Sequence, residues 1–175
     1  MDRAQAIVVV GVESTGKSTL ARALAEHTGR TLVPEIARSW LDARGNRYEE
    51  GDLEPIARLQ WRAEADAART KEGVVADTDL VVIRIWSEVR FGRCAPWILE
   101  ALATRPPAVY LLTRPDLPWE PDPQRASPDA AERAALHARY RRLLRELGHP
   151  WHEIGGEGDA RLAAALAALD GEHGA

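Results

Sequence analysis

Residues 11–18 read GVESTGKS and fit the pattern G-x-x-x-x-G-K-[ST] at every fixed position. Glycines let a backbone curl until several amide N–H groups converge on one anion, because they accept positive φ and carry no side chain. A Lys at position 17 would place a point charge beside the β- and γ-phosphates of a nucleoside triphosphate, and Ser18 would offer a hydroxyl ligand to Mg²⁺. The nucleotide contacts are therefore expected from Gly11, Glu13, Ser14, Thr15, Gly16, Lys17, Ser18 and Thr19.

Two acids follow a short apolar segment further along the chain. Asp77 ends the run VVAD, which is where a P-loop protein usually carries the acid that holds Mg²⁺ through water. Asp79 comes two residues later, so on an extended chain it would point the same way. Either acid could instead cap a helix that begins near Leu80. We expect Asp77 to serve the metal and leave Asp79 open between the two roles.

A carboxylate and an arginine follow the next apolar segment, TLVP. Glu35 should lie at the carboxyl edge of the sheet, where open α/β sheets bind ligands. There it could accept the proton of a substrate hydroxyl as a general base. Arg38 lies three residues later on the same helical face and could orient Glu35 or a substrate oxygen. The alternative is an exposed ion pair with little energetic weight.

The segment RPDLPWEPDPQR at 114–125 contains too many prolines for a strand or helix. Phosphoryl transfer requires exclusion of water and neutralisation of charge, so a lid is expected around 114–133. Arg125 is the preferred charge donor, and Arg114 and Arg133 are the reserves. A solvated loop with incidental arginines is the alternative.

The remaining sequence alternates between apolar β-branched runs and helical patterns, as a parallel sheet covered on both faces requires. Strands are expected at 6–10, 31–33, 74–77, 107–113 and 151–154. Helices are expected at 17–28, 35–43, 52–70, 80–89, 127–147 and 160–169, with Asp52 and Ser127-Pro128 opening the third and fifth. The sequence therefore predicts a three-layer α/β P-loop NTPase fold with about five parallel strands, and one domain over 1–175.

Composition excludes several classes of protein. A net charge of −4 disfavours an obligate nucleic-acid binder. The only cysteine, Cys94, cannot form an internal disulfide or a cysteine-based zinc cluster. The five-residue apolar run near the start is too short for a signal peptide or a membrane span. We expect no nucleic-acid partner, no membrane association and a cytoplasmic location.

Four segments, GVESTGKSTLARALA, PEIAR, DTDL and LLTRPDLPWEPDPQR, occur in this order, with Gln60 between the second and third. Together they resemble the ribosylnicotinamide kinase domain at the C-terminal end of bifunctional NadR proteins, over roughly residues 7–154. The resemblance implies that ATP, with Mg²⁺, phosphorylates the 5′-hydroxyl of nicotinamide riboside to give nicotinamide mononucleotide, a step of NAD biosynthesis. No segment resembles the adenylyltransferase half of those proteins.

The resemblance also implies roles for particular residues. Glu35 and Arg38 match the family's E-x-x-R, and Asp77, Trp119, Asp122 and Arg125 match its metal, substrate and lid positions.

Two departures concern the substrate. The family places aromatics beside the motif's Glu, whereas Pro34 and Ile36 stand there in this chain, and the family's lid motif D-G-x-R reads Asp-Pro-Gln-Arg at 122–125. These changes imply either another nucleoside or a pyridine ring held by Trp40, Trp86 or Trp119.

The leading hypothesis is therefore a P-loop kinase acting on a small nucleoside, with nicotinamide riboside as its first substrate candidate. A kinase for another nucleoside or metabolite is the first alternative, and a nucleotide-dependent regulatory ATPase or switch is the second. A GTPase is disfavoured, because the chain has no N-K-x-D segment to read guanine. The oligomeric state stays open.

Overall fold

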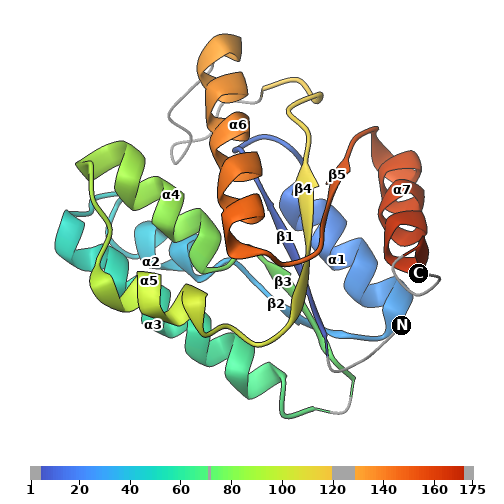
Figure 1. The fold of residues 1–175 in the computed structure, drawn as a ribbon, viewed down its shortest axis with the longest axis horizontal. Coiled ribbons are helices and arrows are strands. Elements are labelled where there is room, and N and C mark those ends of the chain that lie inside the picture. The colour runs from blue at the N-terminus through green and yellow to red at the C-terminus, as the bar shows by residue number, and fades with distance from the viewer. Residues whose placement is uncertain (1–4, 71, 120–128, 172–175) are drawn as a thin grey trace.

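One parallel sheet of five strands runs through the centre of the molecule, in the order β2-β3-β1-β4-β5 (Figure 1). The structure, a computed structural model, describes residues 5–70, 72–119 and 129–171. The strands are β1 (Ala6–Gly11), β2 (Thr31–Val33), β3 (Val74–Asp77), β4 (Ala108–Thr113) and β5 (Trp151–Ile154). The helices are α1 (Lys17–Thr28), α2 (Ile36–Asp42), α3 (Glu50–Ala67), α4 (Leu80–Phe91), α5 (Pro96–Ala103), α6 (Ala130–Leu147) and α7 (Gly158–Gly171).

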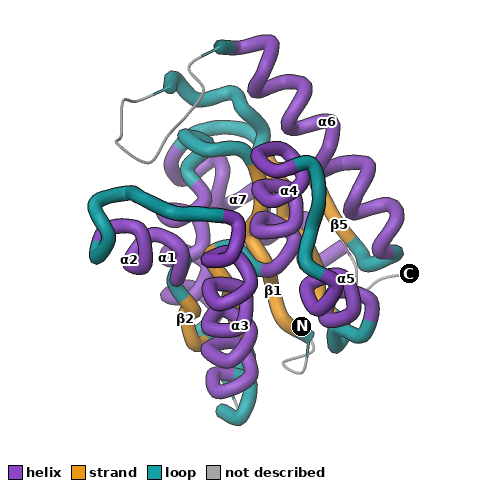
Figure 2. Tube along the Cα trace, turned by 90° about the vertical axis from the view of Figure 1, so that its left-hand side faces the viewer, coloured by secondary structure: helices purple, strands orange, loops and turns teal. Residues whose placement is uncertain are grey.

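Helices cover both faces of the sheet, which gives three layers (Figures 1 and 2). Along β1, Ile7 and Val9 pack against α1 and α7 on one face. Val8 and Val10 pack on the other face, within the core to which α2–α6 contribute. Successive side chains of a strand point to opposite faces, so a continuous apolar run fits a strand that is buried on both sides. The predicted three-layer α/β P-loop NTPase fold is confirmed.

The register of β1 with its two neighbours sets where the functional loops emerge. β1 pairs with β3 through Val9 and Asp77, and with β4 through Gly11 and Thr113. Because all strands are parallel, their carboxyl ends meet at one edge of the sheet, which is where open α/β sheets bind ligands. The loops after β1, β3 and β4 therefore leave the sheet side by side.

Two helix caps differ from the sequence prediction. Helix α3 begins earlier than expected, because Glu49 occupies the N-cap and Asp52 is the N3 partner of a reciprocal capping box, in which the Glu49 amide donates to Asp52 at 2.8 Å. Helix α6 is capped by Asp129, which accepts from the Glu132 amide at 2.8 Å. The predicted opening at Ser127-Pro128 lies outside the described residues.

Helix α5 was not predicted at all. It is short, and its start is marked by Pro96 at the first helical position, where a missing N–H costs nothing. Ile98 and Leu102 bury its apolar face against the core. Within the described parts of the chain, no helix combines the length and apolar character needed to cross a membrane.

A buried ionic cluster joins α3, the start of α4 and the segment before β4. Arg105 donates to Glu64 at 2.6 Å and lies 3.3 Å from Asp79, and its side chain is only 4% exposed. Tyr110 donates its hydroxyl to the same Asp79 at 2.8 Å. Burial raises the pKa of Glu64 to about 7, against the opposing effect of Arg105. One arginine thus balances two buried carboxyl groups.

We predict that Arg105→Leu lowers the free energy of unfolding by about 3–5 kcal/mol, because it leaves Asp79 and Glu64 buried without their cation. Urea denaturation measures the change. Arg69→Leu is the matched control, since the Arg69–Asp66 pair is exposed, and it should change the value by less than about 1 kcal/mol. Equal effects of the two substitutions would contradict this account of the cluster.

Candidate active site

The loop between β1 and α1 turns back on itself through three residues with positive φ. These are Gly11 (φ 146°), Ser14 (φ 56°) and Gly16 (φ 73°). Gly16 is also the N-cap of α1, and no side chain caps that helix. The free amide N–H groups of the first helical turn and the positive end of the helix dipole therefore face the same loop. Such an arrangement binds phosphate.

The loop is fixed to β4 by a close contact between backbones. A Cβ atom on Gly11 would lie 2.3 Å from the Thr113 hydroxyl, so no other residue fits without a shift. Thr15 donates its hydroxyl to the Val12 carbonyl at 2.6 Å, and the Thr15 and Thr113 hydroxyl oxygens lie 2.6 Å apart. Both threonines are fully buried. The glycine at position 11 is thus required by space as well as by φ.

Two buried arginines hold the outer side of the loop. Arg133 of α6 donates to the carbonyls of Glu13 and Ser14 at 3.4 and 3.3 Å. Arg161 of α7 donates to the carbonyl of Thr15 at 2.5 Å. Arg133 was predicted as a reserve charge donor, whereas Arg161 was missed, because its helix reads as an Ala/Leu helix that only supports the core. Both arginines bring positive charge to the loop from distant parts of the chain.

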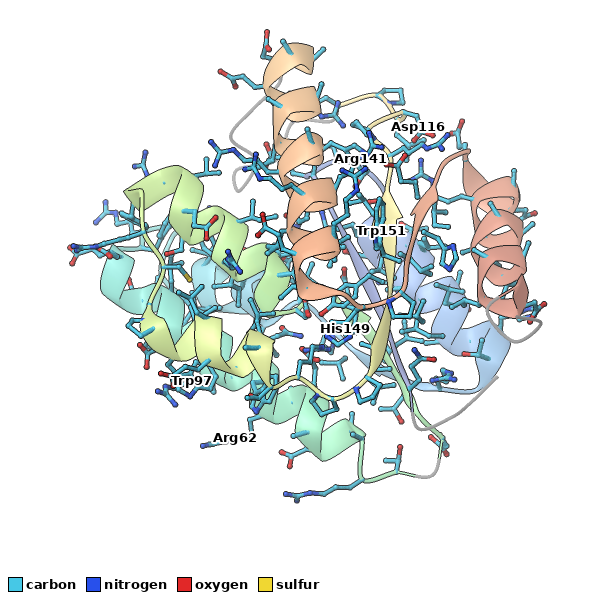
Figure 3. All side chains as sticks on the ribbon, viewed as in Figure 1. Arg62, Trp97, Asp116, Arg141, His149 and Trp151 are labelled. Atoms are coloured by element: carbon cyan, nitrogen blue, oxygen red, sulfur yellow. The ribbon has the colours of Figure 1, made fainter. Side chains whose placement is uncertain are left out.

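Arg161 also connects the loop to the base of the predicted lid. Its guanidinium pairs with Asp116, which lies beyond the end of β4 (Figure 3). Asp116 accepts a hydrogen bond from the Gly156 amide at 2.9 Å, and Arg161 donates to the Gly156 carbonyl at 2.6 Å. A Cβ atom on Gly155 would approach Asp116 to 2.9 Å. The glycine-rich turn after β5 therefore packs against the start of the lid.

The ammonium group of Lys17 lies among carboxylates. Its Nζ donates to the Val12 carbonyl at 2.9 Å. Desolvation lowers the pKa of Lys17, while the negative charges of Glu35, Asp77 and Glu13 oppose that shift. The structure thus brings Lys17, Glu35 and Asp77 together from three different segments. A phosphate group at Lys17 would supply the negative charge that favours the ammonium form.

Asp77 at the end of β3 and Asp79 just after it have different surroundings. Asp77 is buried at the strand end, and its Oδ1 atom has no hydrogen-bond partner among the described residues. Asp79 is fully buried and caps α4 by accepting from the Val81 amide at 2.9 Å, in addition to its contacts in the ionic cluster. The expectation that both acids point the same way is wrong. Thr78 has a φ of 68° and so interrupts the alternation of an extended chain.

The donor set fits a Mg²⁺ ion that is bound mainly through phosphate oxygens and water. An unpartnered buried carboxylate oxygen, such as Asp77 Oδ1, is costly unless a cation or an ordered water satisfies it. Ser18 begins the exposed side of α1 and carries the second oxygen expected at the metal. Mg²⁺ usually keeps several waters and takes only one or two protein ligands.

Glu35 is the N-cap residue of α2, and its Oε2 atom lies 3.9 Å from Arg38 Nε. Its neighbour Ile36 donates its amide to the side-chain oxygen of Gln60 at 3.0 Å. Gln60 is buried in α3 and donates its amide to the Thr78 carbonyl at 3.3 Å. One glutamine side chain therefore fixes the backbone beside Glu35 relative to the backbone beside Asp77. The sequence singled out Gln60 only through the family resemblance.

Three tryptophans were candidates for stacking on a substrate ring, and two have partners within the fold. The Arg44 guanidinium lies 3.7 Å from the ring centre of Trp40. Trp86 donates its indole N–H to the Tyr48 hydroxyl at 2.9 Å and packs edge-on against that ring. The indole N–H of Trp119 is buried without a partner in the described structure. The indole N–H of Trp40 is unpartnered in the same way, so Trp119 differs from the other two only in having no ring or cation contact among the described residues.

A family model described as an AAA domain matches residues 6–161. The chain belongs to this AAA domain family. No curated protein matches it significantly.

Solved structures with the same fold include NadR in complex with NR, which has a TM-score of 0.77 and 22% identity over 98% of this chain. NadR in complex with NAD and AMP-PNP has a TM-score of 0.73 and 20% identity, again over 98% of this chain. The chain spans about half of each NadR chain, 52% and 50%. Thymidylate kinase from Ehrlichia chaffeensis has a TM-score of 0.69 and 13% identity, covering 96% of this chain and 98% of its own.

The predicted site residues of this AAA domain fall into two groups. The described structure brings Lys17, Glu35, Arg38 and Asp77 to the carboxyl edge of the sheet, beside the 11–18 loop. Asp122 and Arg125 lie outside the described residues, so their roles stay predictions. Leu117, in the segment predicted to form a lid, contacts the loop, since a Cβ atom on Gly16 would lie 3.1 Å from the Leu117 Cδ1 atom.

For this AAA domain we predict that Gly11→Ala lowers the free energy of unfolding by about 1–3 kcal/mol, because the new methyl group displaces Thr113 from the loop. Denaturant unfolding measures the loss. Gly51→Ala is the control: Gly51 lies in α3 with open space around its Cα, so alanine should leave stability unchanged or raise it by up to about 1 kcal/mol. A neutral Gly11→Ala would refute the close contact.

Proposed function

We propose that this chain is an ATP-dependent kinase that phosphorylates the 5′-hydroxyl of nicotinamide riboside to give nicotinamide mononucleotide. The observation that carries the proposal is the meeting of Lys17, Glu35 and Asp77 at the 11–18 loop, because nucleotide, metal and acceptor groups are all needed within one small space. The fold shared with nucleoside and nucleotide kinases, among them NadR bound to NR, supports the same class of reaction.

The nucleotide phosphates would bind to the amide groups of residues 11–16 and to Lys17. Ser18 and Asp77 would hold Mg²⁺, which neutralises charge on the phosphate oxygens when it is bound. Glu13, Ser14, Thr15 and Thr19 complete the contacts.

Glu35 would accept the proton of the attacking 5′-hydroxyl, and Arg38 would orient the substrate. The hydroxyl oxygen then forms a bond to the γ-phosphorus as the bond between that phosphorus and the bridging oxygen of ADP breaks. The 3.9 Å distance between Arg38 Nε and Glu35 Oε2 supports a carboxylate that is held in place for this step. The hydrogen bonds of Gln60 with the Ile36 amide and the Thr78 carbonyl would keep Glu35 at a constant distance from Asp77, the proposed metal ligand.

The lid around 114–133 would close over the transferring group. Arg125 would supply positive charge, Asp122 would bind the substrate, and Trp119 would stack on its ring. Arg133 already contributes charge at the loop. With Pro34 and Ile36 beside Glu35, ring recognition would depend on Trp119 more than on residues of α2. The domain would act on a small nucleoside, without nucleic acid or membrane, in the cytoplasm.

We predict that Glu35→Gln lowers kcat by about 10²–10⁴-fold while the affinity for Mg²⁺-ATP changes less than about threefold, because Glu35 acts on the acceptor and not on the nucleotide. Lys17→Ala should abolish turnover, since it removes the charge at the phosphates. Steady-state ADP release and equilibrium nucleotide binding measure the two effects. Glu26→Gln, at an exposed position of α1, is the matched control and should keep full activity. Full activity of Glu35→Gln would exclude the general base.

The substrate is tested by ADP release from Mg²⁺-ATP against a panel of nucleosides that includes nicotinamide riboside, with products identified by mass. We expect nicotinamide mononucleotide. Phosphorylation of a different nucleoside would retain the kinase and reject the substrate. Binding of ATP with no phosphorylated product across the panel would favour a nucleotide-dependent switch instead.

A further inference from the structure

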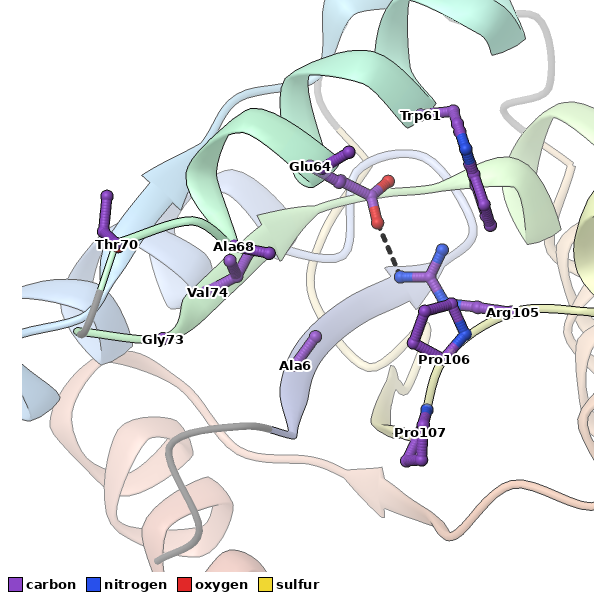
Figure 4. Close-up of a pocket in the computed structure, with 11 residues that line it drawn as sticks. Ala6, Trp61, Glu64, Ala68, Thr70, Gly73, Val74, Arg105, Pro106 and Pro107 are labelled. Atoms are coloured by element: carbon purple, nitrogen blue, oxygen red, sulfur yellow. Dashed lines mark hydrogen bonds and ion pairs between the residues drawn. The ribbon is translucent and has the colours of Figure 1, made fainter.

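A second pocket, of about 470 Å³, lies at the end of the sheet opposite the nucleotide loop (Figure 4). Its lining includes the first residues of β1 and β3, Ala6 and Val74, and Pro107 just before β4. Strand starts and strand ends lie at opposite edges of a parallel sheet, so this pocket is separate from the site that contains Lys17. Its volume is that of a typical small-molecule site.

Most of the pocket wall is apolar. The indole of Trp61 and the rings of Pro106 and Pro107 form apolar surfaces (Figure 4). The small side chains of Ala65 in α3 and of Ala68, the C-cap of that helix, also line the pocket. A wall of this kind favours a flat ring that excludes water from the same surfaces.

The polar part of the pocket is the Glu64–Arg105 pair, joined at 2.6 Å (dashed in Figure 4). Glu64 Oε1 and Arg105 Nε are both buried without a hydrogen-bond partner in the described structure. Gln60, one turn earlier on α3, also interacts with the Glu64 carboxyl group, and it donates a hydrogen bond to the Thr78 carbonyl at 3.3 Å. An unsatisfied buried donor or acceptor costs about 1–3 kcal/mol, so a ligand that satisfies both atoms is favoured.

We propose that this pocket is a ligand site for a small, neutral aromatic carboxamide. The amide NH₂ would donate to Glu64 and the amide oxygen would accept from Arg105, while the ring lies against Trp61 and the prolines. The ligand is neutral because Arg105 already has Glu64 and Asp79 as its counter-ions, and a charged ligand would be buried without a counter-ion of its own. Binding of the carboxamide does not depend on the kinase activity proposed above.

The pocket is connected to the nucleotide edge through Arg105. Its Nη1 atom lies 3.3 Å from Asp79, which caps α4 two residues after the metal acid Asp77. A ligand that shifts the guanidinium changes the support of Asp79 and of the β3–α4 connection. Coupling between two sites is reciprocal, so each ligand alters the affinity of the other by the same factor. This coupling, unlike the binding, rests on the proposed nucleotide site.

The test is a titration of the ¹⁵N-labelled full chain with benzamide in the absence of nucleotide, monitored by NMR. We expect saturable shifts of the Trp61 indole N–H and of the Glu64, Ala65 and Arg105 amides, with a Kd on the order of 1 mM for so small a probe. Benzoate carries a charge and lacks the donor, and acetamide lacks the ring, so each should bind at least about tenfold more weakly.

Ala65→Phe fills the pocket from an exposed position of α3 and keeps both members of the ion pair, and it should weaken benzamide binding at least about tenfold. Ala167→Phe, on an exposed position of α7, is the matched control and should leave the Kd unchanged. The proposal is overturned by an absence of saturable shifts, by shifts confined to residues 11–18, or by unchanged affinity in Ala65→Phe. If Mg²⁺-ATP does not alter the Kd of benzamide, the coupling is overturned but the binding site is not. Because the NMR titrations measure binding without turnover, a failure to detect kinase activity would leave their results unchanged.

Discussion

The contact between Gly11 and Thr113 is the constraint on which the site depends. It occurs because β1 and β4 pair in register through their last residues, so the nucleotide loop begins where β4 ends. The absence of a side chain at position 11 lets the Thr113 hydroxyl reach the Thr15 hydroxyl, which in turn holds the Val12 carbonyl. Sheet register thus determines the shape of the loop, and the sheet core on both faces determines the register.

Two acids that lie two residues apart at this edge of the sheet, Asp77 and Asp79, have different partners. Asp77 ends β3 opposite Val9 and keeps a buried oxygen without a partner, whereas Asp79 contributes its whole carboxylate to a helix cap, a tyrosine and an arginine. The positive φ of Thr78 separates them by turning the chain between strand and helix. One of the two carboxylates thus contributes to the fold, and the other keeps the buried oxygen for which we propose a metal.

Sequence alone predicts the local features of this chain well. Continuous β-branched runs indicate buried parallel strands, and the spacing of Gly11, Gly16 and Lys17 indicates the loop, because each pattern depends only on nearby residues. The contacts of Arg161 with the Thr15 carbonyl could not be predicted, since they join residues 146 positions apart. For Asp79 the sequence offered a helix cap as one of two roles, and the structure shows that cap; its contacts with Arg105 and Tyr110 could not be predicted, because those residues reach it from another part of the chain.

The buried arginines explain how a loop of few residues can direct its amide groups inward. In a planar trans peptide the carbonyl of one residue and the N–H of the next point in opposite directions. Arg133 and Arg161 bind the carbonyls of Glu13, Ser14 and Thr15 from outside the loop, which turns the amide N–H groups that follow them toward its interior. Their charges also raise the potential at the anion without contact. Because these arginines come from α6 and α7, the last third of the chain completes a phosphate site whose motif lies entirely in the first twenty residues.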